Sequence, residues 1–533
     1  MSTPNLTLKE RKRRRFRLVI PAFPTFNIYS SFAKRMTALG PICIGTMANK
    51  LARWDVEIID ENNYGKRGLR DDQGHPDHEG LQASRPADVV GFYGGLTSTV
   101  PRLYELAKRY KALGVVTLGG GQHFVEDNIR EGLSEGLDYI ILGEGEYTIS
   151  EFLEACDRGA SVDAIKGLAF LEAGQVVTTP SREPITDFEA LPIPDFGLLR
   201  NAKLKYYPVS WARGCGMDCE FCTVKGKMRS CGPERVMAQI SSLVERYHAK
   251  NFFVVDDFFG PNRKEAMSLC RMLKDYSART GVKLRIMVQI RLEKAKDVEL
   301  LRAMRAAGVN GVAIGIESPI PQDLEAMNKK LKPDQMVNWV RTFRREGFFV
   351  HGMFIFGYPR QPGSECEMSI EERTRHFRRF IRKSHLDTVQ VLLPVPLPGT
   401  ELTRRLEADG RIFDRDVVGW EYYDGNFPLF VPDPPLTAEQ LHWGVQKIMS
   451  RFYRFKYMLF TALNVLWFPS IVLWFHRLRG GWRSWYRVWR NHLVRFGGWV
   501  VLRRWKSAYK QGTFEEKLKV AEQRLGRESR PAD

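Results

Sequence analysis

Short apolar runs alternate with helix-like stretches over residues 16–171 of the chain. The runs predicted to be strands are Arg17–Pro21, Val56–Asp60, Asp88–Tyr93, Val115–Gly119, Tyr139–Gly143 and Gly167–Leu171. Stretches such as Leu39–Leu51 and Val100–Leu113 separate them and are predicted to be helices. This alternation indicates a doubly wound, Rossmann-like α/β domain with a parallel sheet. Such sheets bind ligands beyond the carboxyl ends of their strands.

The same alternation resumes after a proline-spaced linker at Pro192–Asp195. The strands predicted there are Phe252–Asp257, Arg285–Gln289, Gly311–Glu317, Val350–Gly357 and Thr388–Leu393. Repeated strand–helix units with polar residues at the strand ends predict a full or partial parallel barrel of the TIM type. The chemistry of such a barrel lies at its carboxyl-terminal mouth.

The chain, at 533 residues, is too long for one hydrophobic core. We predict a basic tail at residues 1–15, an α/β domain with its linker at 16–190, a barrel at 191–430 and a helical region at 431–533. The tail lacks the apolar segment of a signal peptide. Its basic residues predict either a solvated tail or a clamp on anionic lipid; they are Lys9, Arg11, Lys12, Arg13, Arg14 and Arg15.

The net charge of +19 indicates an anionic partner, either nucleic acid or a lipid surface. The C-terminal region favours lipid, because Tyr457–Phe475 is nearly continuous in apolar residues and has about the length of a spanning helix. Arg477–Lys510 then interleaves arginines with tryptophans, and no Asp or Glu occurs from Arg451 to Lys510. We predict a monotopic or re-entrant membrane anchor. A buried helical hairpin that closes the barrel is the structural alternative.

Three cysteines stand close together at the spacing C-x3-C-x2-C, namely Cys215, Cys219 and Cys222. Thiolates on one loop can hold an iron–sulfur cluster, and three ligands leave one iron of a [4Fe-4S] cubane open to a small molecule. Structural zinc with Cys231 as a fourth ligand is the alternative. A zinc ribbon would show a second C-x2-C pair, which this chain lacks.

The cysteine spacing, with Phe221 before the third cysteine, resembles the signature of the radical S-adenosylmethionine (SAM) enzymes. In that family the open iron chelates SAM, and an electron cleaves it to a 5′-deoxyadenosyl radical. The resemblance implies that Glu317, in the sequence Gly-Ile-Glu-Ser, contacts SAM. Other strand-end residues are expected to bind SAM or the substrate; they are Asp256, Asp257, Gln289, Arg291 and Gly357.

Small and glycine-rich turns follow three strands of the N-terminal domain. These turns contain Thr97 and Ser98, then Gly119, Gly120 and Gly121, and then Gly143, Glu144 and Gly145. Glycines let a backbone approach a bulky ligand, and hydroxyls can bond its phosphate. Placed before the cysteine motif, the turns resemble the cobalamin-binding domain of class B radical SAM enzymes.

Two features qualify the cobalamin expectation. The chain lacks the D-x-H-x-x-G pattern by which other cobalamin domains supply a histidine to cobalt, since Asp77–Gly80 has the wrong spacing. Relatives that have lost the cofactor also exist. His123, in the second glycine turn, is expected either to contact the ligand or to stabilise the turn.

The resemblance covers roughly residues 16–430 and implies a radical SAM enzyme that uses SAM, a [4Fe-4S] cluster and cobalamin. We expect it to C-methylate an unactivated carbon of a hydrophobic, lipid-like substrate. Radical cyclisation or C–C coupling on a lipid or tetrapyrrole is an alternative, and a noncatalytic cobalamin or Fe–S sensor docked at the membrane is another. The expected partners are an electron donor such as flavodoxin or ferredoxin and the inner face of the cytoplasmic membrane, with no nucleic acid.

Overall fold

A computed structural model describes residues 13–65, 67–363, 368–466, 481–511 and 514–528. Its N-terminal sheet has seven strands in the order β2-β1-β3-β4-β5-β6-β7. The strands are β1 Arg14–Ile20, β2 Trp54–Asp60, β3 Val89–Tyr93, β4 Val116–Gly120, β5 Tyr139–Ile141, β6 Leu168–Glu172 and β7 Gln175–Thr178. Strands β1 to β5 pair in parallel, whereas β6 and β7 add an antiparallel edge. The strand order reverses between β1 and β3, which places a topological switch point there.

Helices cover both faces of this sheet, as the doubly wound prediction requires. The helices are α1 Ser30–Ala33, α2 Leu39–Ala48, α3 His78–Ser84, η1 Thr97–Thr99, α4 Val100–Ala112, α5 Asp127–Ser134 and α6 Glu146–Arg158. Phe16 and Ile58 pack in one core with Phe152 of α6. Val19 and Phe92 pack in a separate core that includes residues of α4. Alternate residues along a strand therefore pack into the cores on opposite faces of the sheet.

The start of β1 corrects the predicted tail. Arg14 and Arg15 belong to the strand, where they form ion pairs with Asp157 at 3.0 Å and Asp55 at 2.7 Å. These two arginines therefore neutralise carboxylates of the domain instead of extending a basic tail. The basic residues Lys9, Arg11 and Lys12 lie outside the described residues.

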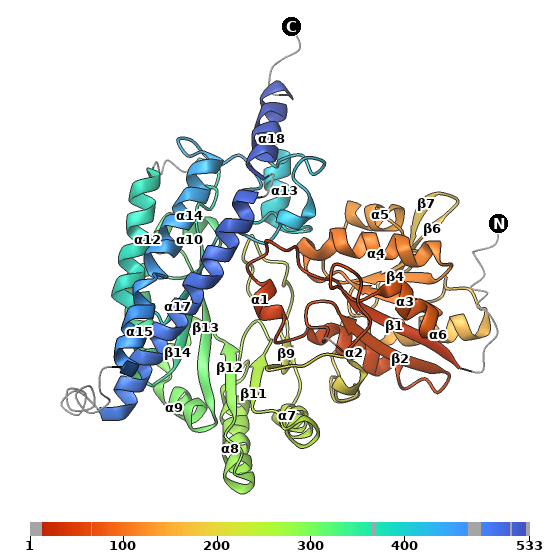
Figure 1. Cartoon of the computed structure of the whole chain (residues 1–533), viewed down its shortest axis with the longest axis horizontal. Helices are drawn as coiled ribbons and strands as arrows, with labels where there is room; N and C mark the ends of the chain where they lie inside the picture. Colours follow the sequence, from red (N-terminus) through yellow and green to blue (C-terminus); the bar gives the residue numbers. More distant parts are fainter. Residues whose placement is uncertain (1–12, 66, 364–367, 467–480, 512–513, 529–533) are drawn as a thin grey trace.

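The second sheet has six parallel strands in the order β15-β14-β13-β12-β11-β8. They are β8 Tyr207–Val209, β11 Asn251–Val254, β12 Arg285–Gln289, β13 Val309–Glu317, β14 Phe349–Ile355 and β15 Thr388–Leu392. Its helices are α7 Pro233–Tyr247, α8 Arg263–Thr280, η3 Leu292–Lys296, α9 Val298–Ala306, α10 Pro321–Ala326, α11 Pro333–Arg345 and α12 Ile370–Ser384. The end strands β8 and β15 are not neighbours, so the predicted barrel is a partial one. Figure 1 shows this sheet beside the N-terminal one.

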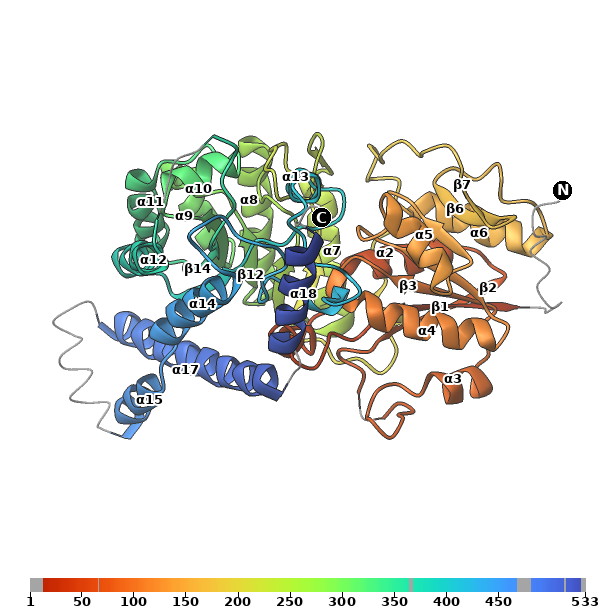
Figure 2. The same cartoon turned by 90° about the horizontal axis from the view of Figure 1, so that it is seen from above.

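The remaining elements connect the two sheets or cover the second. They are η2 Phe196–Leu198, the paired β9 Ala212–Arg213 and β10 Arg229–Ser230, α13 Glu401–Ala408, η4 Trp420–Tyr422, α14 Ala438–Phe452, α15 Lys456–Leu466, α17 Gly481–Gln511 and α18 Phe514–Glu528. Helices α15 and α17 lie side by side (Figure 2), and α17 in turn contacts β15 of the second sheet. On α17, Asn491 donates to Asp387 and Arg495 donates to the Leu386 carbonyl oxygen at 2.8 Å.

Helix α17 thus packs on the second sheet, as the hairpin alternative requires, whereas α15 leaves Leu459 and Leu463 exposed and is not a buried arm of a hairpin. Of the apolar run predicted as an anchor, residues 457–466 form most of α15, and residues 467–475 lie outside the described part. Within the described ranges, no helix is both long and apolar enough to cross a membrane.

Candidate active site

The cysteine loop is framed by the two-residue strands β9 and β10, which pair antiparallel. Glycines make its entry possible, because Gly214 and Gly216 adopt φ of +83° and +68°. A side chain at Gly214 would also place a Cβ 2.8 Å from the Lys227 carbonyl oxygen. The alternating glycines around Cys215 thus allow a tight, left-handed backbone that only glycine adopts readily.

The three predicted cysteines lie on this loop among cationic groups. Arg291 donates to the carbonyl oxygen of Cys215 and stands 3.4 Å from its Sγ atom. The Val224 backbone N–H lies 3.4 Å from the Sγ atom of Cys222. Burial raises the pKa of Cys219, and the nearby Lys329 opposes that rise. Positive charge and N–H donors at the sulfurs suit thiolates that ligate a cluster.

The fit of these cysteines to a cluster rests on their donor chemistry. Among the described residues, no group of three or more His, Cys, Asp or Glu side chains is already gathered as a metal site. Cys231 does not join the three, because its Sγ atom donates to the Trp211 carbonyl oxygen at 3.3 Å. Burial raises the pKa of Cys231 to about 12, so this thiol keeps its proton in the contact with the Trp211 carbonyl oxygen.

Glu317 lies close to the cysteine loop, where its charge adds to the raised pKa of Cys219. It ends β13 with φ +61°, and its carboxylate forms an ion pair with Lys329 at 2.7 Å. Burial lowers the pKa of Lys329, but Glu317 and the thiols of Cys219 and Cys215 outweigh this, so the pKa lies above its usual value. A non-glycine residue in the left-handed region is strained and is often found at functional sites.

The two acids that follow β11 have different tasks. Asp256 is buried, and it accepts hydrogen bonds from Trp211 N at 2.9 Å and Ser210 Oγ at 2.8 Å. Asp256 therefore holds the chain entering the cysteine loop, and its oxygens are already engaged. Asp257 is exposed, and its charge contributes to a raised pKa of Cys222. Asp257 is the better placed of the two to meet a ligand.

Gln289 and Gly357 have structural reasons for their positions. The Gln289 side chain donates to the Asp256 carbonyl oxygen at 3.2 Å. Gly357 has φ +78°, and a Cβ there would lie 2.5 Å from a methyl group of Leu441 on α14. Close packing of α14 therefore already requires glycine at this position.

The residues predicted in the glycine turns gather at the carboxyl ends of β3, β4 and β5. Thr97 and Ser98 are buried in η1. Gly121 has φ +134°, and a side chain there would collide with the Gly94 backbone. Gly143 has φ +74° with open space where a Cβ would stand.

Packing against apolar side chains explains two other glycines of these turns. A Cβ at Gly119 would lie 2.5 Å from Leu137, and one at Gly145 would lie 3.0 Å from Ile141. Gly120, the last residue of β4, would meet only ordinary contacts. Close contacts therefore require glycine at Gly119, Gly121 and Gly145, whereas a side chain at Gly143 would meet only open space.

Glu144 bridges the two domains. Its carboxylate accepts hydrogen bonds from Arg213 and Arg229, both at 2.9 Å. These arginines belong to β9 and β10, which frame the cysteine loop. The predicted cofactor residue Glu144 is therefore already engaged in fixing that loop against the turn after β5.

His123 is a buried, neutral histidine. Burial lowers its pKa to about 3, and Arg415 adds to that effect. Its backbone N–H donates to Gly94 at 3.0 Å, and its Nε2 atom lies 3.4 Å from the Tyr104 hydroxyl. The neighbouring Gln122 accepts from Thr223 of the cysteine loop at 3.2 Å. These contacts favour the turn-stabilising role.

Sequence reasoning missed Glu220, which lies between the second and third cysteines. It is buried and accepts from Tyr358 Oη at 2.6 Å and Arg405 Nε at 2.6 Å. This side chain ties the cysteine loop to α13 and to the turn after β14. Its only sequence signal was its place inside the motif.

The inner face of the second sheet carries the other residues that were missed. On β14 burial alternates, so that Val350, Gly352 and Phe354 are buried and the residues between them are half-buried. Phe354 packs against the rings of Phe377 and Phe380 on α12, so the buried positions face the helices. The half-buried residues of β11, β12, β14 and β15 share the opposite face; they are Phe253, Met287, Gln289, Phe349, His351, Met353, Ile355, Gln390 and Leu392.

This inner face is mainly apolar, with a few connected polar groups. His351 lies 2.9 Å from Thr388 Oγ1 through Nδ1 and 3.2 Å from Gln390 Oε1 through Nε2. Burial lowers the pKa of His351, which keeps it neutral. Gln390 donates to Tyr29, which reaches in from the N-terminal domain. An apolar surface with few oriented polar groups is typical of sites for organic ligands.

Comparison with known proteins adds independent findings. Residues 209–372 match a family model described as the radical SAM superfamily. The chain is 29% identical to an uncharacterized methyltransferase from Pyrococcus horikoshii, across 75% of this chain and 84% of that protein. It is 26% identical to the anaerobic magnesium-protoporphyrin IX monomethyl ester cyclase from Rubrivivax gelatinosus, across 69% and 65%. It is 29% identical to the hopanoid C-2 methylase from Rhodopseudomonas palustris, across 45% and 46%.

Solved structures show the same fold. The radical SAM methyltransferase TsrM from Kitasatospora setae, with cobalamin and a [4Fe-4S] cluster bound, matches with a TM-score of 0.60 and 19% identity. That match covers 74% of this chain and 78% of TsrM. The cobalamin-dependent radical enzyme OxsB matches with a TM-score of 0.60 and 15% identity, across 97% and 84%. The arrangement of a doubly wound domain before an open parallel sheet is therefore shared with both.

Proposed function

The chain is a radical SAM enzyme whose N-terminal domain is of the B12-binding type, and from this premise we propose that it methylates an unactivated carbon of a hydrophobic substrate. The single observation that carries the substrate class is the inner face of the second sheet. Apolar side chains such as Met287, Met353 and Leu392 are only half-buried there. Burial of apolar substrate against them would be favourable by about 25 cal/mol for each Å² removed from water.

The cofactors expected at this site have clear candidate ligands in the chain. Cys215, Cys219 and Cys222 would hold a [4Fe-4S] cluster, and the turns after β3, β4 and β5 would hold cobalamin. When bound, the cluster and SAM supply the 5′-deoxyadenosyl radical, and cobalamin supplies the methyl group. An electron donor such as flavodoxin or ferredoxin would be needed as a partner.

The side chains around the site would position these groups and balance their charge. Arg291 and Lys329 offset the negative charge of three thiolates. Glu317 presents a carboxylate at the mouth of the sheet, where the amino group of SAM would be recognised. Gln390 and the neutral His351 offer hydrogen bonds to a sparse polar group on an otherwise apolar substrate.

We further propose that the enzyme works at a membrane surface, where a hydrophobic substrate would reside. Helix α15 supports this, because it exposes apolar side chains to solvent. The basic, tryptophan-rich α17 packs against it. Such a helix pair suits the boundary between headgroups and acyl chains.

Radical ring closure is the second candidate reaction. The similarity to the magnesium-protoporphyrin IX monomethyl ester cyclase, which extends over 69% of this chain, supports ring closure as an alternative to methylation. A cyclase and a methylase differ in the fate of the SAM methyl group, so one experiment separates them.

Reconstituted protein would be incubated with methyl-deuterated SAM, cobalamin, a reductant and a lipid extract. Methylation predicts 5′-deoxyadenosine together with a hydrophobic product that carries the labelled methyl group. Formation of 5′-deoxyadenosine with an unlabelled product that has lost two hydrogens would support ring closure instead. Absence of 5′-deoxyadenosine under reducing conditions would contradict both reactions.

A further inference from the structure

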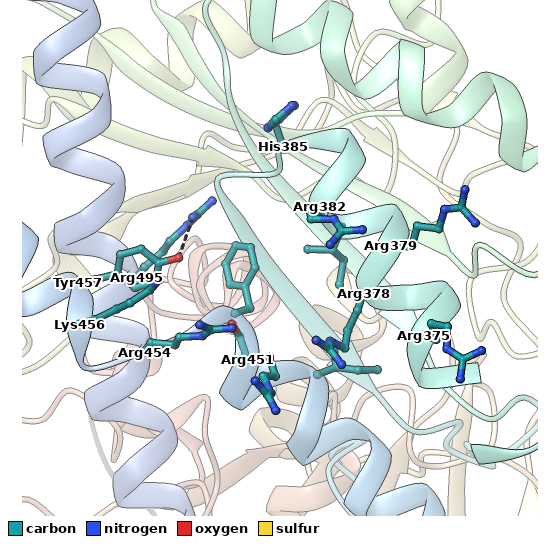
Figure 3. Close-up of a pocket in the computed structure, with 13 residues that line it drawn as sticks. Arg375, Arg378, Arg379, Arg382, His385, Arg451, Arg454, Lys456, Tyr457 and Arg495 are labelled. Carbon is teal, nitrogen blue, oxygen red and sulfur yellow. Dashed lines mark hydrogen bonds between the residues drawn. The ribbon is translucent and has the colours of Figure 1, made fainter. Parts of the chain in front are cut away.

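A strongly basic groove of about 670 Å³ lies on the outer side of the catalytic domain, between α12 and the junction of α14 with α15 (Figure 3). Among the residues that the structure describes, no Asp or Glu lines it. The cysteine loop does not contribute to it, so the groove is separate from the candidate active site. Its charge needs an explanation of its own.

One wall of the groove is a stripe of arginines on α12. Arg375, Arg378, Arg379 and Arg382 stand at i, i+3, i+4 and i+7, which places them on one side of the helix. All four are exposed, and none forms an ion pair with a carboxylate in the described part of the chain. Like charges at this spacing destabilise a helix, so the stripe lowers the stability of the protein alone.

The facing wall adds further positive charge from the end of α14 and the start of α15. Arg454 donates through Nε to the Arg451 carbonyl oxygen at 2.7 Å, which leaves the rest of its guanidinium at the groove. Lys456 lies over the rings of Tyr457 and Phe460 at 5.8 and 5.7 Å. Figure 3 shows these residues across the groove from the α12 stripe.

Apolar surface continues from the groove along α15. The floor of the groove includes Ile381 and Phe452. Beside it, α15 exposes Leu459 by 51%, Phe460 by 41% and Leu463 by 47%. Phe460 and Leu463 follow Lys456, which lines the groove, by four and seven residues and so lie on the same side of the helix. Anion-binding groups therefore adjoin a face that suits hydrocarbon.

We propose that this groove binds the phosphate headgroup of an anionic phospholipid while the exposed face of α15 enters the acyl layer. Arginine guanidinium groups match phosphate oxygens through paired hydrogen bonds. The exposed face of α15 favours a lipid over a nucleic acid, because a phosphate backbone offers nothing to bury it. The inference rests on the proposed membrane association but not on the methylation chemistry.

The test compares charge reversals in the full-length protein. Arg378→Glu/Arg379→Glu removes half of the α12 stripe. Arg271→Glu/Lys274→Glu makes the same charge change on the exposed face of α8 and serves as the matched control. Each protein is sedimented with vesicles of phosphatidylcholine alone or mixed with phosphatidylglycerol. Thermal unfolding and 5′-deoxyadenosine formation without vesicles check that both variants are folded and loaded.

The groove variant should bind phosphatidylglycerol vesicles at least about twentyfold more weakly than the parent, and the control should lose less than about threefold. Leu459→Ser, tested separately, should weaken binding to the same vesicles without changing its dependence on salt. Equal losses in the two charge variants would overturn the proposal, because general attraction would then explain the binding. Displacement of the parent from vesicles by single-stranded RNA but not by added salt would overturn it in favour of nucleic acid. These outcomes are independent of whether methyl transfer is observed.

Discussion

The two parallel sheets of this molecule are built from the same strand–helix units but use their faces differently. The N-terminal sheet is covered by helices on both sides, and its strands bury residues in two separate cores. The helices of the second sheet cover one of its faces, and its inner face, which Tyr29 and Arg490 reach from other elements, keeps a row of half-buried apolar side chains. A sheet packed on both faces can offer a ligand only its edge, whereas the partial barrel also offers a face.

Substitutions at two adjacent residues of β14 give the strongest test of this difference between the two sheets. Phe354→Ala should lower the free energy of unfolding by about 3–5 kcal/mol, because it leaves a cavity against α12. Met353→Ala should cost less than about 1 kcal/mol, because its side chain is only half-buried. Chemical denaturation measures both changes, and product formation should fall in the Met353 variant. Equal losses of stability would contradict an open inner face.

The edge of the N-terminal sheet can be examined with two glycines. Gly121→Ala should destabilise the protein by roughly 3 kcal/mol, because it combines a left-handed backbone with a collision against Gly94. Gly143→Ala should cost only about 1 kcal/mol, because open space receives the methyl group.

Titration of these variants with cobalamin then tests whether the turns bind the cofactor, separately from their effect on stability. If Gly143 lies against the cofactor, its alanine variant should bind cobalamin more weakly although it remains stable. Unchanged cobalamin affinity in that variant would place the cofactor elsewhere along the edge.

Asp256 adds an expected dependence of stability on pH. Burial raises the pKa of Asp256 to about 7 despite hydrogen bonds from Trp211 and Ser210. The folded protein therefore holds a proton that the unfolded chain releases near pH 4, at roughly the ordinary carboxyl pKa. The unfolding free energy attributable to this group should fall as the pH rises from that point to about 7. Asp256→Asn should flatten this part of the stability curve, and a variant curve parallel to the parent's would contradict the assignment.

Much of the fold could be predicted, because local patterns determine where strands lie. The expected strand at Arg285–Gln289 coincides with β12, and most other strands begin within three residues of their predicted positions. The end of β5 shows the limit of this approach. The strand was expected to continue to Gly143, but it ends at Ile141 because its neighbour β4 ends at Gly120. Pairing between strands, which no local pattern contains, decided that boundary.

The candidate site was less predictable, because its side chains depend on distant partners. Glu144 was expected at a cofactor, yet two arginines that lie 69 and 85 residues away along the chain engage it. Asp256 was expected to bind SAM or the substrate, but the backbone N–H of Trp211, which leads into the cysteine loop, donates to both of its carboxylate oxygens. Tyr29 meets Gln390 only when the two domains pack together. In contrast, the cysteines were found at once because their chemistry lies in the spacing itself.

The most direct test of the account compares two single cysteines. Cys219→Ala removes a proposed cluster ligand, whereas Cys231→Ala removes a buried thiol that donates to the Trp211 carbonyl oxygen. Iron content, the visible absorbance of the cluster and 5′-deoxyadenosine formation would be measured after reconstitution of both variants. The account predicts loss of all three signals in the Cys219 variant and their retention in a folded Cys231 variant. A Cys219 variant that keeps full iron and cleaves SAM at the parental rate would contradict it.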